Sequence, residues 1–486
     1  MTSTEPQDHP VVPTTRGPVR GERRTDGSLR FLGIPYAQPP VGELRFAAPV
    51  PPRPWTEVLD ATAYGPTAQR RPFSEVTTIP EPTIPGESVL NLNVFTPGLA
   101  PAAALPVLVW IHGGGFVAGC SASPWYDGAA FNRDGVIVVS IGYRLGIEGF
   151  LHLPDAPDNR GVRDWIAALE WVRDNIASFG GDPAKVTVAG QSAGGGAVQT
   201  LLATPSARGL FRAAISASGA VARPQDRATA EAVSRALTAR TGVPATAAAL
   251  RSLSDERLLE LQDALGEAGP DGGDALPPLS LAPFADGELV PLPVPQALPD
   301  AETPLLLGFT AHEFAAPAED GGDADTEPED ELLGLLGALG LNEHGAGRFL
   351  TEHPGANGGD AITDWLFRAP ALALAEARAE RERPTWLYQF DWSGSAPGRA
   401  GQAYHCIDLP FAFDLLDAEG AEAALGAAPP QALADAVHGA WVAFVRDLDP
   451  GTDWPPYHHG RATMRWTAEP RTEHDPLRTV RDIWHA

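Results

Sequence analysis

The sequence is poor in cysteine, methionine and lysine, and it contains no long hydrophobic run. Two cysteines, Cys120 and Cys406, cannot form a disulfide framework, and two free thiols are typical of a reducing compartment. No run approaches the roughly 18 consecutive apolar residues of a membrane span. Residues 1–19 are polar and proline-rich and lack the apolar segment of a signal peptide. The sequence therefore predicts a soluble, cytoplasmic protein without a membrane partner.

Basic residues are also scarce: 35 lysines and arginines face 62 acidic residues, which gives a net charge of −27. Binding to nucleic acid or to an anionic membrane needs a basic surface, so neither is an expected partner. The chain has 43% hydrophobic and 20% charged residues, an ordinary composition for a globular protein. A single lysine, many arginines and abundant alanine, glycine and proline indicate a bacterial gene of high GC content.

The most informative stretch is Gly-Gln-Ser-Ala-Gly at residues 190–194. Residues 185–189 before it predict a buried strand, and residues 195–202 after it predict the start of a helix. A serine on a sharp strand-to-helix turn between two glycines is the nucleophile elbow of the α/β-hydrolases. The glycines are needed because a Cβ at either position would strike a neighbouring strand or helix. Ser192 is therefore the predicted nucleophile.

A second motif follows another predicted strand, at residues 106–111. It reads His-Gly-Gly-Gly-Phe at residues 112–116, which is the pattern of the oxyanion loop of esterases and lipases. Glycines allow backbone N–H groups to approach a carbonyl oxygen that becomes negative during attack. Gly114 and Gly115 are the expected donors, and the N–H of Ala193 is the expected third.

Strands and helices alternate along the chain. Apolar runs predict further strands at residues 90–95, 136–141, 211–218, 304–309 and 386–390. Apolar residues at helical spacing predict helices around residues 165–176 and 437–448. This alternation indicates an α/β fold, with a mostly parallel central sheet and helices on both faces.

We expect one α/β-hydrolase catalytic domain over residues 16–486, preceded by a disordered arm at residues 1–15. Helical insertions around the active site are expected at about 224–300 and 315–380. Within the second insertion, residues 319–331 hold eight acidic side chains. Two interpretations of this segment stay open: a solvated loop, or an acidic rim that attracts cations at the substrate entrance.

Taken together, the motifs resemble those of the type-B carboxylesterases, the family of para-nitrobenzyl esterases and cholinesterases. The likeness extends over nearly the whole chain, and its further elements are Phe31-Leu32-Gly33-Ile34-Pro35-Tyr36-Ala37, Tyr143-Arg144-Leu145-Gly146, Phe179-Gly180-Gly181-Asp182-Pro183, Asp408-Leu409-Pro410-Phe411 and Trp454-Pro455-Pro456-Tyr457. Two positions depart from the family. Gln191 replaces the usual glutamate before the nucleophile, which is expected to change hydrogen bonding there. Val89 replaces a disulfide cysteine of many animal members.

The resemblance implies a catalytic triad in the chain order serine, acid, histidine. It assigns the acid to Glu313, shortly after a predicted strand, and the histidine to His405, just before the Asp-Leu-Pro-Phe element. On this mapping His405 takes the Ser192 proton and Glu313 orients the imidazole. The neighbours of the acid are His312 and Phe314, where the family often has an acidic residue and a glycine.

Other histidines compete for the role of base. His112 belongs to the oxyanion loop, and His312 lies beside the acid in the sequence. His458 and His459 stand in a proline-rich tail, where a surface position is expected. His405 therefore remains the expected base.

The resemblance implies a serine esterase that forms an acyl-enzyme and releases it to water, with a small-molecule ester as its partner. An alternative is the same triad acting on an amide or thioester, or transferring the acyl group to an acceptor other than water. A non-catalytic interaction protein of this fold is less expected, because it would have lost the nucleophile or the histidine. No residues have metal-ligand spacing and no phosphate-binding loop is present, so neither a metal nor a cofactor is expected.

Overall fold

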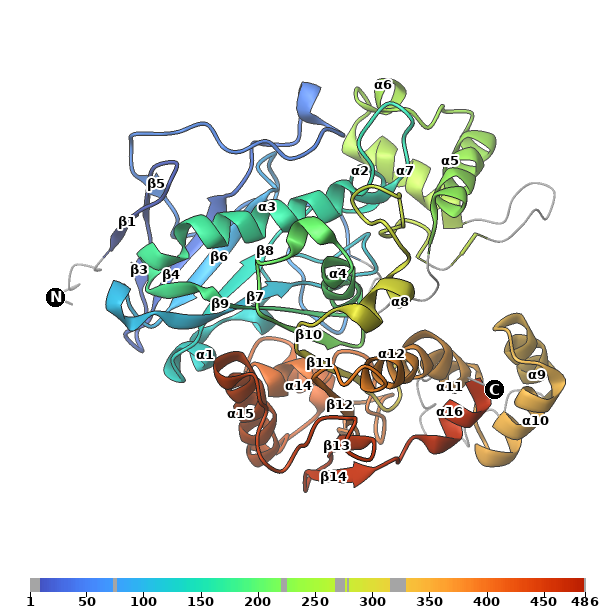
Figure 1. Ribbon diagram of the computed structural model, residues 1–486. Helices are drawn as coiled ribbons and strands as arrows, with labels where there is room; N and C mark the ends of the chain where they lie inside the picture. The colour runs from blue at the N-terminus through green and yellow to red at the C-terminus, as the bar shows by residue number, and fades with distance from the viewer. Residues whose placement is uncertain are drawn as a thin grey trace.

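The computed structural model describes residues 9–72, 77–219, 225–266, 276–277, 279–314 and 329–484. Within these residues one large sheet crosses the molecule (Figure 1), with the strand order β14-β13-β12-β11-β10-β9-β7-β8-β6-β4-β3. Its strands are β3 Glu22–Arg23, β4 Leu29–Pro35, β6 Asn91–Thr96, β7 Leu105–Ile111, β8 Ile137–Ile141, β9 Gly181–Gln191, β10 Ala213–Ala217, β11 Leu305–Thr310, β12 Thr385–Phe390, β13 Ala462–Trp466 and β14 Arg471–His474. A small sheet is formed by β1 Val11–Pro13, β2 Pro18–Arg20 and β5 Leu59–Asp60.

The centre of the large sheet is parallel. Neighbouring strands pair in parallel from β8 through β7, β9, β10, β11 and β12 to β13. Antiparallel pairs occur toward both edges, between β13 and β14 and among β8, β6, β4 and β3. The predicted α/β class with a mostly parallel sheet is confirmed. The sequence did not predict β13 and the edge strand β14, because both are short and arginine or glutamate interrupts their apolar pattern.

Helices cover both faces of this sheet and extend beyond one end of it (Figure 1). They are α1 Ala129–Arg133, α2 Gly146–Phe150, α3 Arg160–Asn175, α4 Ala193–Leu202, α5 Arg227–Thr241, α6 Ala247–Leu250, α7 Asp255–Gly266, α8 Val294–Ala297, α9 Glu329–Ala338, α10 Glu343–Glu352, α11 Gly358–Thr363, the π-helical turn η7 Asp364–Arg368, α12 Ala369–Ala379, α13 Leu409–Ala412, α14 Ala421–Leu425, α15 Gln431–Asp447 and α16 Arg478–Trp484. The expected insertion at 224–300 contains α5 to α8, and the one at 315–380 contains α9 to α12.

The N-terminal arm differs from its prediction. Val11–Pro13 is a strand that pairs antiparallel with Pro18–Arg20, and the Val12 side chain is buried beside Val19. The expectation of disorder is therefore wrong for this part of residues 1–15, because a buried valine and a paired strand hold it to the domain. Residues 1–8 lie outside the described residues, as does most of the acidic segment 319–331, of which only the last three residues appear, at the start of α9.

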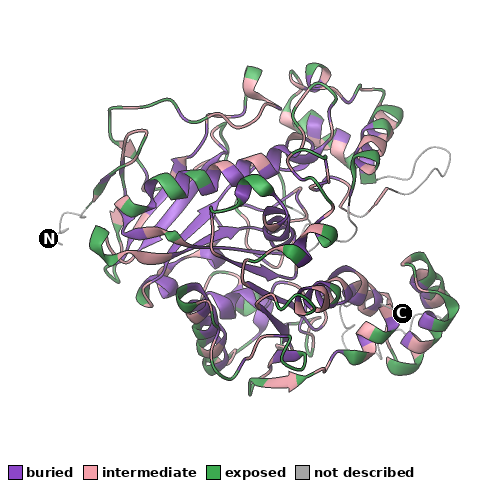
Figure 2. Cartoon of the chain, in the orientation of Figure 1, coloured by how far each residue is buried: buried purple, intermediate pink, exposed green. Residues whose placement is uncertain are grey.

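The central strands are buried on both faces (Figure 2). In β7 the side chains alternate between two apolar clusters. Val107, Val109 and Ile111 face the cluster that contains α3 and α4, whereas Leu108 and Trp110 face the cluster that contains α15. This double burial explains why the strand sequences are continuous apolar runs rather than alternating ones.

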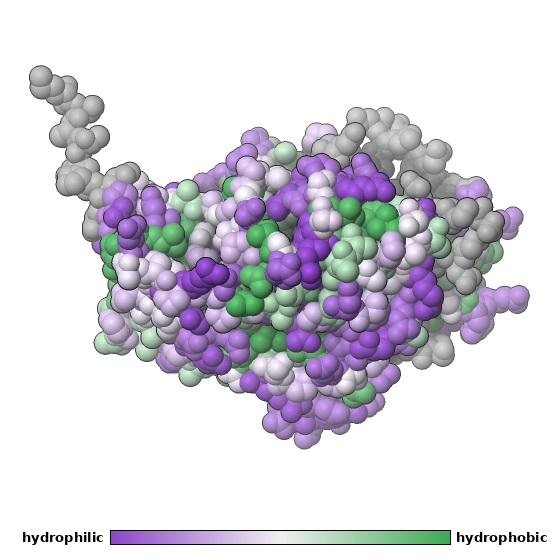
Figure 3. Space-filling view, turned by 90° about the horizontal axis from the view of Figure 1, so that it is seen from above, coloured by the Kyte–Doolittle hydropathy of each residue, from purple (hydrophilic) through white to green (hydrophobic). Residues whose placement is uncertain are grey.

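One face of the molecule is shown by residue hydropathy in Figure 3. On the face seen in Figure 3, hydrophilic residues are spread widely and hydrophobic residues form scattered patches between them. No helix in the described part of the chain is long and apolar enough to span a bilayer.

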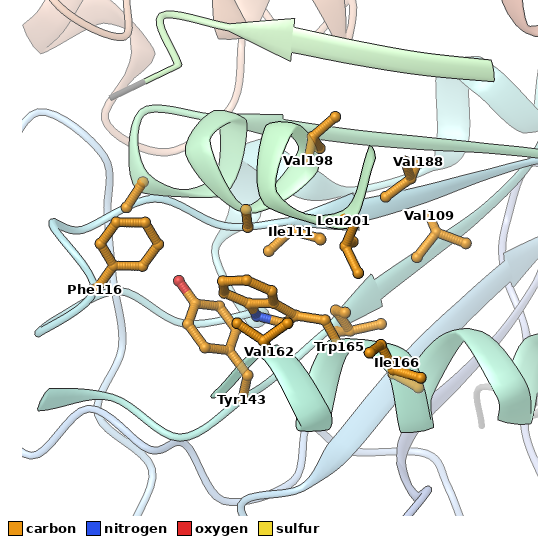
Figure 4. Packing of buried hydrophobic residues seen from close by; sticks show 14 of the residues in the cluster. Val109, Ile111, Phe116, Tyr143, Val162, Trp165, Ile166, Val188, Val198 and Leu201 are labelled. Carbon is orange, nitrogen blue, oxygen red and sulfur yellow. The ribbon is translucent and has the colours of Figure 1, made fainter. Parts of the chain in front are cut away.

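A buried ion pair fixes α3 behind the predicted oxyanion loop. The Arg144 guanidinium donates to both carboxylate oxygens of Asp164 on α3, at 2.7 and 2.8 Å, and its Nη1 donates to the Ala47 carbonyl at 2.6 Å. Neither side chain of the pair is more than 1% exposed. Next to them, Trp165 packs edge-on against Tyr143 at 5.4 Å between ring centroids, and both lie close to Phe116 (Figure 4).

Replacing Asp164 by asparagine should lower the free energy of unfolding by about 3–5 kcal/mol, because it leaves a buried guanidinium without a compensating charge. Denaturant unfolding of the purified variant measures this loss. Glu231→Gln is the matched control, because Glu231 pairs with Arg235 at 3.7 Å on an exposed face of α5. The control should cost less than about 1 kcal/mol. Equal losses in the two variants would contradict this account of the pair.

Candidate active site

Ser192 stands at the sharp turn that the glycine pattern predicted. It lies between the end of β9 and the start of α4, with φ 57° and ψ −123°, a strained conformation for a residue with a side chain. A Cβ at Gly190 would lie 2.4 Å from the Gly194 carbonyl oxygen, and a Cβ at Gly194 would lie 2.0 Å from the Ile111 carbonyl oxygen. Only glycine fits at these two positions, as expected from the sequence. The Ser192 N–H donates to Ala217 O at 2.9 Å, which ties the turn to β10.

The predicted oxyanion loop lies against this turn. A Cβ at Gly113 would be 3.2 Å from the Ser192 Cβ, so the loop leaves no space between itself and the serine. Gly114 and Gly115 have positive φ angles of 104° and 60°. The N–H groups of Gly114, Gly115 and Ala193 donate to no acceptor among the residues that the structure describes. Three unpaired donors beside the serine, one of them at a helix N-terminus, form a site suited to a developing oxyanion.

Side chains from other segments hold the oxyanion loop in place. The Gln69 amide accepts from the Gly119 N–H at 2.6 Å and donates to the Glu81 carbonyl at 3.0 Å. The Tyr143 hydroxyl donates to the His112 carbonyl at 3.0 Å, and the two rings stack at 4.4 Å. Gln69 lies in an irregular segment without a motif, so no signal in the sequence pointed to it.

His112 is a structural member of this loop. Its Nδ1–H donates to the Gly113 carbonyl at 2.8 Å. Burial lowers the pKa of His112 to about 4, so the ring is neutral at physiological pH. A general base must exchange protons near neutral pH, so this lowered pKa makes His112 unsuited to that role.

Glu313 and His405 are brought together across 92 residues of sequence. The His405 Nδ1–H donates to Glu313 Oε2 at 2.5 Å, and the other carboxylate oxygen accepts from the Thr310 N–H at 2.9 Å. Glu313 is 2% exposed and lies three residues beyond the end of β11. The carboxylate therefore fixes the ring tautomer with a proton on Nδ1 and a lone pair on Nε2.

Gln191 occupies the other side of the His405 ring. Gln191 Nε2 lies 3.1 Å from His405 Nε2, and the tautomer set by Glu313 makes the amide the donor and the ring the acceptor. Gln191 Oε1 is buried without a partner in the described part of the chain. No hydrogen bond links Ser192 Oγ to His405 among the described residues. The structure thus joins the expected acid and base directly and places the residue before the serine at the reactive nitrogen.

Charges around His405 set its proton affinity. Burial acts to lower the pKa of His405, Cys406 and Glu313 act to raise it, and the net effect raises it well above the ordinary value of 6.5. Burial also raises the pKa of Cys406, so this thiol is neutral at physiological pH and Glu313 supplies the stabilising charge. Burial and the Glu313 charge raise the pKa of Asp408 to about 7, and this carboxyl accepts from the Tyr388 hydroxyl at 3.1 Å.

His312 connects the segment of the acid to the segment of the base. Its N–H donates to Ala403 O at 2.9 Å, and its Nδ1 accepts from the Ala403 N–H at 3.0 Å. A third bond runs from the His405 N–H to Glu313 O at 3.1 Å. Burial lowers the pKa of His312, in agreement with a neutral ring that accepts at Nδ1. The sequence placed His312 beside the acid but gave no sign of this link.

The other two histidines considered as the base, His458 and His459, lie on the surface. The rings of His458 and His459 contact each other at 4.3 Å, and both residues are exposed. Within the described ranges, no group of three or more histidine, cysteine or acidic side chains could hold a metal ion.

Known proteins similar to this chain are carboxylesterases. The profile of the carboxylesterase family matches residues 8–333 and 351–484. The chain is 38% identical to the para-nitrobenzyl esterase of Bacillus subtilis (strain 168), over 96% of this chain and 97% of that protein. It is 34% identical to a phenmedipham hydrolase of Pseudarthrobacter oxydans, over 92% and 93% of the two chains. Among solved structures, a thermophilic PNB esterase superposes with a TM-score of 0.85 at 35% identity, over 98% of this chain and all of that one.

The titration of His405 should respond in opposite directions to its two side-chain neighbours. In NMR titrations the His405 ring should have a pKa above 6.5. Glu313→Gln should lower that pKa, because it removes the charge that stabilises the imidazolium. Gln191→Glu should raise it further, because a carboxylate would then face Nε2.

Resonances of His458 and His459, which are exposed and contact each other, are the internal control for this titration. A His405→Asn variant assigns the signal. If Glu313→Gln leaves the His405 titration where it was, the carboxylate does not control this ring.

Proposed function

The chain belongs to the carboxylesterase family and is a carboxylic ester hydrolase of the serine esterase type, and on that premise we propose which residues perform the reaction. Ser192 is the nucleophile, His405 the general base and acid, and Glu313 the residue that orients the imidazole. The observation that carries this proposal is the 2.5 Å contact between the buried Glu313 carboxylate and His405 Nδ1. It puts the ring proton on Nδ1 and so leaves the lone pair on Nε2, the nitrogen that Gln191 at the serine turn contacts.

In the acylation step, Ser192 Oγ attacks the ester carbonyl carbon while His405 Nε2 takes the hydroxyl proton. The carbonyl oxygen becomes negative and accepts hydrogen bonds from the N–H groups of Gly114, Gly115 and Ala193. The tetrahedral intermediate collapses, the C–O bond to the alcohol breaks, and His405 gives its proton to the leaving oxygen. Water then attacks the acyl-serine with the same proton transfers, which releases the acid.

Gln191 must give up its hydrogen bond to His405 Nε2 during this cycle. Its amide donates to the nitrogen that has to accept the Ser192 proton, so the two residues compete for one lone pair. Catalytic hydrogen bonds often form fully only when substrate is bound. After protonation, the Gln191 carbonyl, which has no partner in the described part of the chain, can accept from the imidazolium if the amide turns over.

We propose small carboxylic esters as the substrate class. A relative is named for para-nitrobenzyl esters, and these are suitable first substrates for this chain. Amides, thioesters and acyl acceptors other than water stay open as alternatives, because they would use the same triad. A screen of matched 4-nitrophenyl esters, anilides and thioesters separates these classes.

We also propose a bacterial, cytoplasmic enzyme that does not bind nucleic acid. The two cysteines are buried and unpaired, which suits a reducing compartment. The net charge of −27 disfavours contact with phosphate backbones.

Labelling and substitution test the nucleophile. A fluorophosphonate should add one label to the peptide that contains Ser192, and Ser192→Ala should lower kcat by about 10⁴-fold or more. Ser206→Ala is the control, because Ser206 is exposed on the surface. Full ester turnover by Ser192→Ala would remove this residue from the mechanism.

The pH dependence of kcat/KM tests the base. Activity requires neutral His405, so it should fall as the pH drops through an apparent pKa above 6.5. Glu313→Gln should move this acid limb to lower pH and reduce turnover by orders of magnitude. Gln191→Glu should move the limb to higher pH while preserving turnover on its plateau. A limb that stays fixed in both variants would point to another base.

A further inference from the structure

Phe314 is an exposed aromatic residue at the site. It follows Glu313 directly, and its side chain is 46% exposed, one of few large hydrophobic residues at the surface of the described chain. Its ring stacks on the His405 imidazole, with centroids 5.3 Å apart and planes at 23°. Phe367 stacks on Phe314 at 5.5 Å and contacts His405 at 5.2 Å. Two phenyl rings therefore stand against the proposed base, and one of them faces solvent.

The position of the Phe314 ring is fixed by its surroundings. Its N–H donates to Thr363 Oγ1 at 3.2 Å, and this buried hydroxyl donates in turn to Gly359 O at 2.8 Å. Phe367 lies on the π-helical turn η7, a kind of helix irregularity often found at functional sites. The next residue of that turn, Arg368, donates to Ala311 O at 2.6 Å, which binds the turn to the segment of the acid. An exposed ring held in this way presents a preformed apolar surface.

The reaction decides which part of a substrate meets this surface. His405 delivers a proton to the oxygen of the departing alcohol, so the carbon atoms of the alcohol lie beside the imidazole. A ring stacked on that imidazole therefore stands beside the alcohol. The acyl chain is bonded instead to the carbon that Ser192 attacks, so it receives no proton from His405.

We propose that Phe314, supported by Phe367, forms the wall of the subsite for the alcohol portion and selects esters of apolar alcohols with about four or more carbons. Contact with the exposed face of the ring removes apolar surface of the alcohol from water, and an aromatic alcohol gains ring–ring contact as well. A small alcohol such as ethanol is too short to cover the ring. This inference rests on the proposed role of His405 as the acid that protonates the leaving group.

Two ester series test the subsite. The alcohol series is ethyl, butyl and benzyl acetate, and the acyl series is methyl acetate, butyrate and hexanoate. Phe314→Ala should lower kcat/KM about tenfold for butyl and benzyl acetate, mainly through KM. The same variant should change ethyl acetate and the whole acyl series less than about twofold. Phe314→Leu, which keeps an apolar side chain, should recover most of the loss for butyl acetate.

Leu292→Ala is the matched control, because Leu292 is also a large exposed hydrophobic residue, at 51%. It should leave both series unchanged. An equal loss on every ester in Phe314→Ala, or a loss confined to the acyl series, would overturn the subsite. A Phe314→Ala variant with an unchanged ratio of kcat/KM for benzyl and ethyl acetate would overturn it as well. These outcomes leave the triad intact, whereas an active His405→Asn variant would contradict the proposed function itself.

Discussion

The close approach of α4 to the ends of β7 and β9 is the constraint on which the site depends. At Gly194 the backbone of α4 comes so near to the Ile111 carbonyl that a Cβ would lie 2.0 Å from it. This contact forces the turn at Ser192 into its positive φ and directs the first N–H groups of α4 toward the serine. It also places the loop after β7 beside the same side chain. The packing of α4 against the end of β7 therefore positions both the nucleophile and the oxyanion donors.

Electrostatics around the base follow from burial. A buried imidazole beside several carboxylates would remain protonated and could not accept a proton. Asp408, whose pKa is raised to about 7, is partly neutralised, and Gln191 is neutral where the family usually has a glutamate. Glu313 remains as the charged carboxylate in contact with the His405 ring. The neutral amide of Gln191 thus keeps the affinity of His405 for protons lower than a second carboxylate would.

Local patterns in the sequence predicted the strands and the turn that carry the site, but not the contacts between side chains from distant segments. Buried parallel strands need continuous apolar runs, and tight turns need glycine, so β7, β9 and the turn at Ser192 were predictable. Glu313 and His405 were assigned by resemblance, because no local pattern links residues so far apart. The Gln69 contact to the oxyanion loop and the stacking of Phe314 on His405 depend on segments that meet only in the folded chain. β1 was missed because one buried valine is too weak a signal against a polar, proline-rich background.

The base is the member of the site with the least direct support from the sheet. Ser192 stands at the end of β9 and Glu313 lies just beyond β11, two strands separated in the sheet by β10 alone. His405 belongs to no strand, and its segment is held by the hydrogen bonds of His312 and Glu313 to residues 403–405. The distance between base and nucleophile is therefore set by the rigid sheet on one side and by this short link on the other. Because the His312 ring accepts at Nδ1, the link requires a neutral histidine, and burial of His312, which lowers its pKa, keeps the ring in that form.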